Sequence, residues 1–245
     1  MKTLIYGHRG AAGYAPENTL EAFQLAVEHQ ADGVELDVHL TRDKQVIVTH
    51  DERIDRVSTG TGLVAMLTLK DIKKHLFNLP HPEYTEARAP LLEEVLELLK
   101  PTGLHINIEL KNSRLPYPGL EQACLELVAR HDMEERVLYS SFNHHSMIRM
   151  KQMNNAVKTG LLYDCCLLDP LHYLKGAGAD AMHPHFTDVL MNQEAYARLR
   201  QAGYPVNVWT VNDERDMRSM FEMEVEILIS NYPDRAVSLR DAVFG

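Results

Sequence analysis

The fold can be predicted from one run of residues and its counterparts along the chain, Gly33-Val34-Glu35-Leu36-Asp37-Val38-His39-Leu40. This is a short, β-rich, apolar run of the kind that forms a strand. Similar runs recur along the chain with helical stretches between them, and this alternation is typical of parallel strands joined by right-handed crossovers. We therefore predict eight strands, at Leu4–Gly7, Gly33–Leu40, Leu104–Leu110, Val137–Ser141, Thr159–Tyr163, Ala181–Pro184, Val206–Val211 and Ile227–Ser230.

An α/β chain with eight strands can close into a TIM (β/α)8 barrel or remain an open doubly wound sheet. The chain has 245 residues, a length that single-domain barrels commonly have. No linker, repeat or low-complexity tract interrupts the strand–helix units. The sequence therefore favours one barrel domain over residues 1–245, and the open sheet is the alternative because periodicity does not reveal closure.

The connection between the second and third predicted strands is unusually long, from about residue 43 to residue 103. Loops of that length are uncommon unless they contain structure of their own. Val46–Val48 is predicted to form an extra short strand, and Leu69–Leu76 and Leu91–Leu99 are predicted to form helices. We therefore expect a small inserted segment after strand two.

The formal net charge of −10 bears on the partners of the protein. A negative field repels nucleic acid and anionic membranes, so we expect neither as a partner. Any anionic substrate must then be held by local positive charge. The sequence leaves the oligomeric state open, with a homodimer as one option.

The N-terminal sequence and the cysteines indicate the compartment. Met1-Lys2-Thr3-Leu4-Ile5-Tyr6 runs straight into His8-Arg9-Gly10, which leaves no room for a cleavable signal segment. No run approaches the roughly 18 apolar residues of a spanning helix, so we expect a cytoplasmic protein. Cys124, Cys165 and Cys166 lack metal-type spacing, and we expect all three to be reduced packing residues.

Polar side chains gather at the predicted carboxyl ends of the strands, where barrels hold their active groups. Glu35 and Asp37 are two residues apart on one strand and point to the same face, and Glu109 can join them from the neighbouring strand. Three unpaired carboxylates would repel one another, whereas a hard divalent cation removes the repulsion and prefers oxygen ligands. The alternative is a solvated edge, or salt bridges to Arg9 and Lys111.

Two histidines are expected at the same mouth of the barrel. His8 follows the first strand, and His50 follows the short strand Val46–Val48. A histidine pair suits acid–base chemistry near neutrality, although a histidine by itself is more often structural or exposed. Arg9 and Lys111 offer the positive charge that an anionic substrate would need in an acidic protein, and the same residues can neutralise carboxylates.

A set of short motifs stands in one order over nearly the whole chain. These are His8-Arg9-Gly10 with Pro16-Glu17-Asn18-Thr19, Glu35-Leu36-Asp37-Val38 with Thr41 and Asp43, His50-Asp51 with Asp55-Arg56, Glu109-Leu110-Lys111, Ser141-Phe142, Val208-Trp209-Thr210-Val211-Asn212 and Ser230-Asn231-Tyr232-Pro233. Each motif alone is weak evidence, but the ordered set is specific. Together the motifs resemble those of the glycerophosphodiester phosphodiesterase family.

The resemblance implies a barrel with an insertion after strand two, and hydrolysis of glycerophosphodiesters to sn-glycerol 3-phosphate and an alcohol such as choline or ethanolamine. It implies that Glu35, Asp37 and Glu109 hold one divalent cation, Mg²⁺ or Ca²⁺. It also implies that His8 and His50 act as general base and general acid, in an order that the residues leave open. The expected substrate-binding residues are Arg9, Lys111, Phe142 and Trp209.

Two departures from the family pattern and two alternative functions accompany this hypothesis. Val57-Ser58 stands where the family often has Thr-Thr, and Ser230-Asn231 stands where Thr-Asp is common, so one hydroxyl and one carboxylate are lost.

The alternative functions are a phosphodiester-binding barrel without turnover and a phospholipase-type enzyme acting on lipid head groups. The intact histidines and carboxylates disfavour the first, and the acidic balance disfavours the second.

Overall fold

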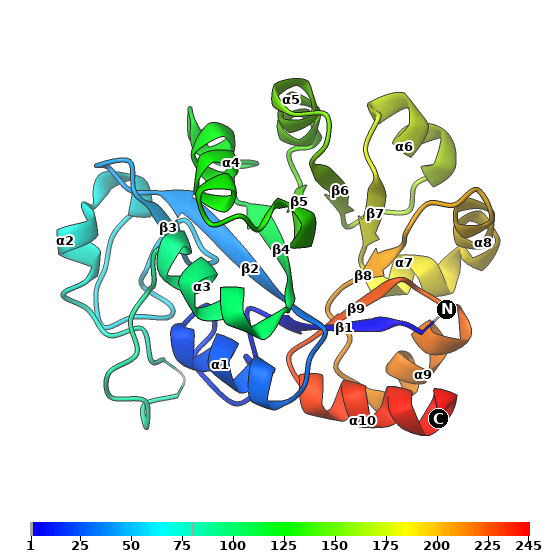
Figure 1. Cartoon of the computed structure of the whole chain (residues 1–245), viewed down its shortest axis with the longest axis horizontal. Coiled ribbons are helices and arrows are strands. Elements are labelled where there is room, and N and C mark those ends of the chain that lie inside the picture. The colour runs from blue at the N-terminus through cyan, green and yellow to red at the C-terminus, as the bar shows by residue number, and fades with distance from the viewer. Residues whose placement is uncertain (1, 80) are drawn as a thin grey trace.

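The strands form a nearly closed barrel in this computed structural model, which describes residues 2–79 and 81–245. Eight parallel strands lie in the order β7-β6-β5-β4-β2-β1-β9-β8, and isolated parallel bridges from Met182 to Val206 and from His185 to Trp209 join the two edges. The predicted (β/α)8 fold is therefore confirmed (Figure 1). The barrel strands are β1 (Leu4–His8), β2 (Gly33–Leu40), β4 (His105–Leu110), β5 (Val137–Ser141), β6 (Lys158–Tyr163), β7 (Ala181–Pro184), β8 (Asn207–Val208) and β9 (Ile227–Ser230).

Helices surround the strands (Figure 1). Those outside the insertion are α1 (Leu20–Glu28), α4 (Leu120–Arg130), η3 (Glu134–Arg136), α5 (His144–Met153), α6 (Pro170–Ala177), α7 (Phe186–Met191), α8 (Gln193–Gln201), α9 (Glu214–Glu222) and α10 (Pro233–Phe244). Thr19 caps the N-terminus of α1, because its side chain accepts a hydrogen bond from the backbone N–H of Ala22. The main apolar core lies between helices and strands and includes the fully buried Phe23 and Leu36. Within residues 2–79 and 81–245, none of the helices has the length and apolar character needed to cross a bilayer.

Strand register determines which side chains meet inside the barrel. His8 pairs with Glu35, Glu35 pairs with Asn107, and Asp37 pairs with Glu109. Paired positions on neighbouring parallel strands point to the same face of the sheet. Three strands therefore direct these side chains into the barrel near its carboxyl-terminal end.

The inserted segment has its own small apolar core. Its elements are β3 (Val46–Val48), which pairs antiparallel with β2, followed by η1 (Val64–Met66), α2 (Leu69–Ile72), α3 (Leu92–Leu99) and η2 (Lys100–Thr102). Ile47, Ile54 and Phe77 belong to an apolar cluster separate from the main core. The part of the segment around α2 lies to one side of the barrel, in cyan, whereas α3 lies beside α1 and belongs to the main core (Figure 1). Strand β3 confirms the expected extra strand after β2.

Three local predictions differ from the structure. Helix α2 ends at Ile72 rather than Leu76, because the N–H groups of Lys74 and His75 bond carbonyls three residues back and the Leu76 N–H donates to the Thr59 hydroxyl. Strand β8 covers only Asn207–Val208, since beyond it the chain joins β7 through an isolated bridge, from Trp209 to His185, rather than through a continuous ladder.

The third difference concerns the cysteines. All three are free thiols, and Cys124 is buried as predicted. Cys165 and Cys166 are exposed, because they lie on the loop that follows β6 rather than within a packed element. The prediction that they are packing residues is therefore wrong.

Candidate active site

Three buried carboxylates converge at the carboxyl ends of β2 and β4. Glu35, Asp37 and Glu109 are 4%, 1% and 9% exposed, and an oxygen atom from each lies within 4.8 Å of the others. Oδ1 of Asp37 is buried and has no hydrogen-bond partner among the described residues. A hard divalent cation fits this donor set, because such cations are bound by carboxylate oxygens. The acidic cluster expected from the sequence spacing is present.

Two basic residues border the acidic cluster. The backbone N–H of Arg9 donates to Glu35 Oε2 at 3.0 Å, and Nε of Arg9 lies 3.4 Å from Asp37 Oδ2. Nζ of Lys111 lies 2.7 Å from Glu109 Oε1 and 3.6 Å from Asp37 Oδ1. These residues neutralise part of the carboxylate charge and also line a pocket above it. Arg9 and Lys111 thus form salt bridges with the carboxylates and also face the pocket.

Burial and charge shift the pKa values of the three carboxyl groups in different directions. Burial, followed by the charges of Asp37 and Glu109, raises the pKa of Glu35 well above its ordinary value. Burial also raises the pKa of Glu109, against the opposing effect of Lys111. Burial of Asp37 acts in the same sense, but His50, Lys111 and Arg9 outweigh it and hold the pKa of Asp37 below its usual range. Excess negative charge in the cluster therefore favours either a proton on a glutamate or a bound cation.

His50 is held at both ring nitrogens. Nδ1 lies 2.6 Å from Asp51 Oδ1, and Nε2 lies 3.1 Å from Lys111 Nζ. An ammonium group donates and cannot accept, so Nε2 is the acceptor and the proton is on Nδ1, which donates to the carboxylate. The backbone carbonyl of His50 accepts from His39 Nε2 at 3.0 Å, while Nδ1 of His39 bonds the Tyr117 hydroxyl. His39 thus supports His50 and is not part of the acidic cluster.

His8 faces the same pocket from the other side of the cluster. Its Nδ1 lies 2.6 Å from Oδ1 of Asn231, and its Nε2 lies 3.9 Å from Glu35 Oε2. The amide oxygen accepts, so Nδ1 carries the proton and Nε2 is free. Burial and the charge of Arg9 lower the pKa of His8 to about 3, which leaves the ring neutral near pH 7. Asn231, where the sequence departs from the family pattern, is therefore the residue that orients His8.

Aromatic and aliphatic side chains form much of the remaining wall of the pocket, which Asn107 and Thr210 complete. The Phe142 and Trp209 rings meet edge to face, with centroids 5.6 Å apart, and Leu162 and Ile229 also line the pocket. Every site residue expected from the sequence lines this pocket except Asp37, which is part of the cluster beside it. His183 does not line the pocket. Its ring is fully buried and bonds Asn207 at 2.8 Å.

Three further residues, for which no role was predicted from the sequence, hold the site together. Arg56 bonds both carboxylate oxygens of Glu17 and also Asp51, and Glu17 in turn accepts from Arg9 at 2.8 Å. The side-chain amide of Asn18 donates to Asp37 Oδ2 at 2.8 Å. All three lie within the quoted motifs, so membership of those motifs was the signal that could have identified them.

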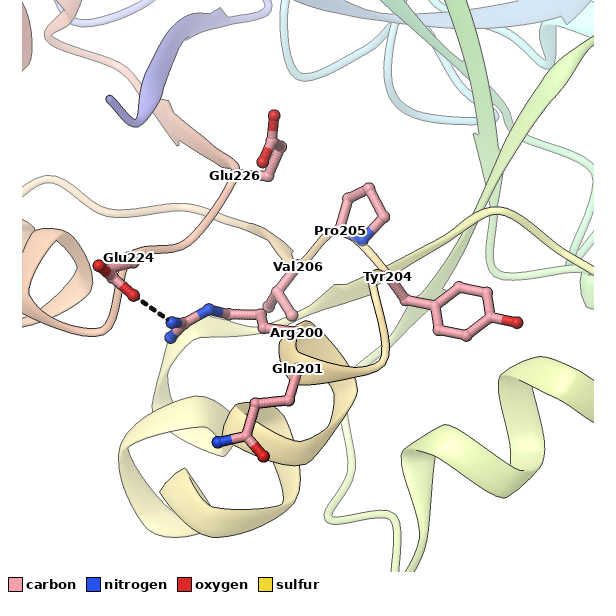
Figure 2. A pocket seen from close by; sticks show the side chains of 8 residues that line it. Arg200, Gln201, Tyr204, Pro205, Val206, Glu224 and Glu226 are labelled. Atoms are coloured by element: carbon pink, nitrogen blue, oxygen red, sulfur yellow. Dashed lines mark hydrogen bonds and ion pairs between the residues drawn. The ribbon is translucent and has the colours of Figure 1, made fainter. Parts of the chain in front are cut away.

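A second cavity lies at the opposite, amino-terminal side of the strands. Figure 2 shows Arg200, Pro205, Glu224 and Glu226 around it. Val206 and Glu226 immediately precede β8 and β9, and the Arg200 guanidinium bonds Glu224 and the Met223 carbonyl. Arg200, the cation that lines this cavity, is thus already paired. In addition, the active groups of such barrels gather at the carboxyl ends of the strands. We therefore assign the functional site to the His8–His50 pocket.

Comparison with known proteins identifies the family. Residues 8–235 match the model of the glycerophosphoryl diester phosphodiesterase family. Proteins named glycerophosphodiester phosphodiesterase from Caldanaerobacter subterraneus subsp. tengcongensis and Bacillus altitudinis are 38% and 37% identical to the chain, over 98% of this chain and 98% of their own lengths in both cases. An Oleispira antarctica phosphodiesterase, solved in complex with the product sn-glycerol-3-phosphate, is 29% identical with a TM-score of 0.86, covering 97% of this chain and 96% of that one. The chain belongs to the glycerophosphoryl diester phosphodiesterase family.

Proposed function

We propose that the protein hydrolyses glycerophosphodiesters to sn-glycerol 3-phosphate and an alcohol, with His8 and His50 as its acid–base pair. The observation that carries the proposal is that both imidazole rings border one pocket together with Glu35 and Glu109 of the buried acidic cluster. Family membership supports the reaction class, and the product bound to the Oleispira antarctica relative supports the product.

The cation in this proposal is a single Mg²⁺ or Ca²⁺ held by Glu35, Asp37 and Glu109. The buried Oδ1 of Asp37, which has no hydrogen-bond partner among the described residues, and the all-oxygen donor set support it, since both ions prefer oxygen ligands. When bound, the cation would supply positive charge for a non-bridging phosphate oxygen and for the glycerol 2-hydroxyl. The amide of Asn18 donates to Oδ2 of Asp37, so Oδ1 is the oxygen that would bind the cation.

Substrate binding in this pocket would combine charge with an apolar wall. Arg9 and Lys111 are the basic residues of the pocket and would hold the phosphodiester, Arg9 with a planar fork and Lys111 with a point charge. Phe142 and Trp209 would lie against the carbon face of glycerol and exclude water from it.

We assign the proton-accepting role to His8 and the proton-donating role to His50. The amide oxygen of Asn231 keeps the proton of the neutral ring on Nδ1, and burial keeps the ring neutral, so Nε2 has a lone pair that could accept a proton. The Asp51 carboxylate would stabilise an imidazolium at His50 once the Lys111 ammonium turns from Nε2 to the phosphodiester, and the ring could then donate to the leaving oxygen through Nε2. Attack by the glycerol 2-hydroxyl would give a cyclic phosphate that water then opens, and direct attack by water would use the same two rings.

The proposal is tested by release of sn-glycerol 3-phosphate from glycerophosphocholine, with and without EDTA. Wild-type protein should be active, and EDTA, His8→Ala and His50→Ala should each reduce kcat by at least about 100-fold. His145→Ala alters an exposed histidine outside the pocket and serves as the matched control. Binding of the substrate without turnover by the wild type would favour the non-catalytic alternative, and full activity in EDTA would refute the cation.

A further inference from the structure

A chain of alternating charges connects the barrel to the inserted segment that carries His50. Its links are Arg9 to Glu17 (2.8 Å), Glu17 to Arg56 (2.7 and 2.8 Å), Arg56 to Asp51 (2.7 Å) and Asp51 to His50 (2.6 Å). Glu17 lies on the loop between β1 and α1, whereas Arg56 and Asp51 belong to the insertion. Arg56 is therefore the residue that joins the two parts beside the pocket.

The geometry of Arg56 leaves it little freedom. Nη1 and Nη2 each donate to a different oxygen of Glu17, and Nε donates to Oδ2 of Asp51. A guanidinium is planar, so a fork that holds Glu17 with two bonds also fixes the direction of the third N–H. The Asp51 carboxylate must then present its other oxygen, Oδ1, to the Nδ1–H of His50.

We propose that Arg56 and Glu17 form a positioning bridge that fixes the His50 ring, through Asp51, with Nε2 toward the pocket. Neither residue lines the pocket, so they act through Asp51 and Arg9 and are not catalytic residues. The same bridge fixes Arg9, whose Nη1 shares Oε1 of Glu17 with Arg56. One carboxylate thus sets the relative placement of the acid–base ring and of a phosphate-binding guanidinium.

The competing explanation is an ordinary surface ion-pair cluster. The Arg56 side chain is 48% exposed, and exposed ion pairs contribute little to stability. Glu17, however, is only 15% exposed and accepts hydrogen bonds from two arginines. A surface ion pair does not usually contain a carboxylate so far removed from water. The positioning bridge predicts a defect in turnover without a defect in folding, whereas a surface cluster predicts neither.

The proposal rests on the acid–base role proposed for His50, so the experiment needs a measurement that does not depend on activity. The variants are Arg56→Gln, Arg56→Lys and Glu17→Gln, in the full-length protein. Arg53→Gln is the matched control, because Arg53 is a half-exposed arginine of the same segment that pairs with Asp55 rather than Asp51. Each protein is assayed for kcat and KM on glycerophosphocholine, and its ¹⁵N-labelled histidine side chains are recorded by NMR, with His50 assigned by its loss in His50→Gln.

Arg56→Gln should lower kcat by about 10- to 100-fold, because small misplacement of a catalytic group has effects of that size. KM should change by less than about threefold, melting should match the Arg53→Gln control, and the His50 Nδ1–H tautomer signal should be lost or averaged. Arg56→Lys should recover only part of kcat, since a point charge cannot hold both carboxylates as the fork does. Wild-type kcat together with an unchanged His50 signal in Arg56→Gln would overturn the bridge. Wild-type kcat in His50→Ala would instead overturn the catalytic role of His50, and the NMR signal would then decide the bridge alone.

Discussion

Nζ of Lys111 lies 3.1 Å from Nε2 of His50 and is the donor in that contact. The same ammonium donates to Glu109 at 2.7 Å, so one cation links an imidazole to the acidic cluster. Its pKa is raised despite burial, because Glu109 and Asp37 outweigh the effect of desolvation, and it therefore stays charged. Lys111 thus fixes the tautomer of His50 and balances carboxylate charge at the same time.

Removing the ammonium of Lys111 should impair both tasks. Lys111→Met keeps an unbranched side chain, one atom shorter, but loses a charge-assisted hydrogen bond to each of His50 and Glu109. Bonds of this type contribute about 1.5–3 kcal/mol, so kcat/KM should fall by about 10- to 100-fold. Steady-state kinetics checks this, with Lys111→Arg as the charge-preserving control. An unchanged kcat/KM in Lys111→Met would contradict the assigned roles.

Cation binding should appear as a stability change that needs all three carboxylates. At a concentration of Mg²⁺ or Ca²⁺ about 100 times Kd, binding to the folded state adds about 2.7 kcal/mol to the free energy of unfolding. For a chain of this size that corresponds to a rise in Tm of roughly 5–10 °C. Glu109→Gln should abolish the rise, and Glu226→Gln, beside the second cavity, should keep it. A rise of wild-type size in Glu109→Gln would exclude Glu109 as a ligand.

His183 should make stability depend on pH in a defined direction. Its fully buried ring has a pKa lowered to about 3 by burial, whereas an unfolded histidine has a pKa of about 6.5. Between these values the unfolded chain binds a proton that the folded chain does not, so stability falls as pH falls below about 6.5. The limiting slope for one group is about 1.4 kcal/mol per pH unit.

His183→Gln keeps a polar partner for Asn207 but cannot titrate. Urea unfolding of both proteins from pH 7.5 to pH 4.5 measures the difference in their free energies of unfolding. The wild type should lose stability relative to the variant as the pH is lowered. Parallel stability curves would show that His183 is not the titrating group.

Gly160 should tolerate no side chain while His183 keeps its ring. A Cβ atom at residue 160 would lie 2.2 Å from Nε2 of His183, well inside van der Waals contact. Forcing atoms into a packed interior costs about 1–3 kcal/mol, which is the expected destabilisation of Gly160→Ala. In a His183→Ala background the same substitution should cost much less, because the obstructing ring is gone. A double-mutant cycle by urea unfolding measures the coupling, and purely additive effects would rule out the clash.

Much of the fold follows from local pattern. The run Gly33–Leu40 and its counterparts predicted the barrel strands, and their alternation with helices predicted parallel pairing. Closure could not be predicted, because it depends on the bridges that join the β7 and β8 edges, Met182 to Val206 and His185 to Trp209. The early end of β8 was also missed, since an apolar run continues past the point where the ladder stops.

For the candidate site, local spacing was enough to predict which carboxylates lie together. Two residues of separation on a strand fix Glu35 and Asp37 on one face, whatever the rest of the chain does. The hydrogen-bond partners that orient the residues of the site, in contrast, depend on the tertiary structure. Asn231 is 223 residues from His8 in the chain yet orients its ring, and Glu17 meets Arg56 across 39 residues. Such contacts form where the barrel brings the ends of different loops together. Local sequence periodicity does not show which loops will meet.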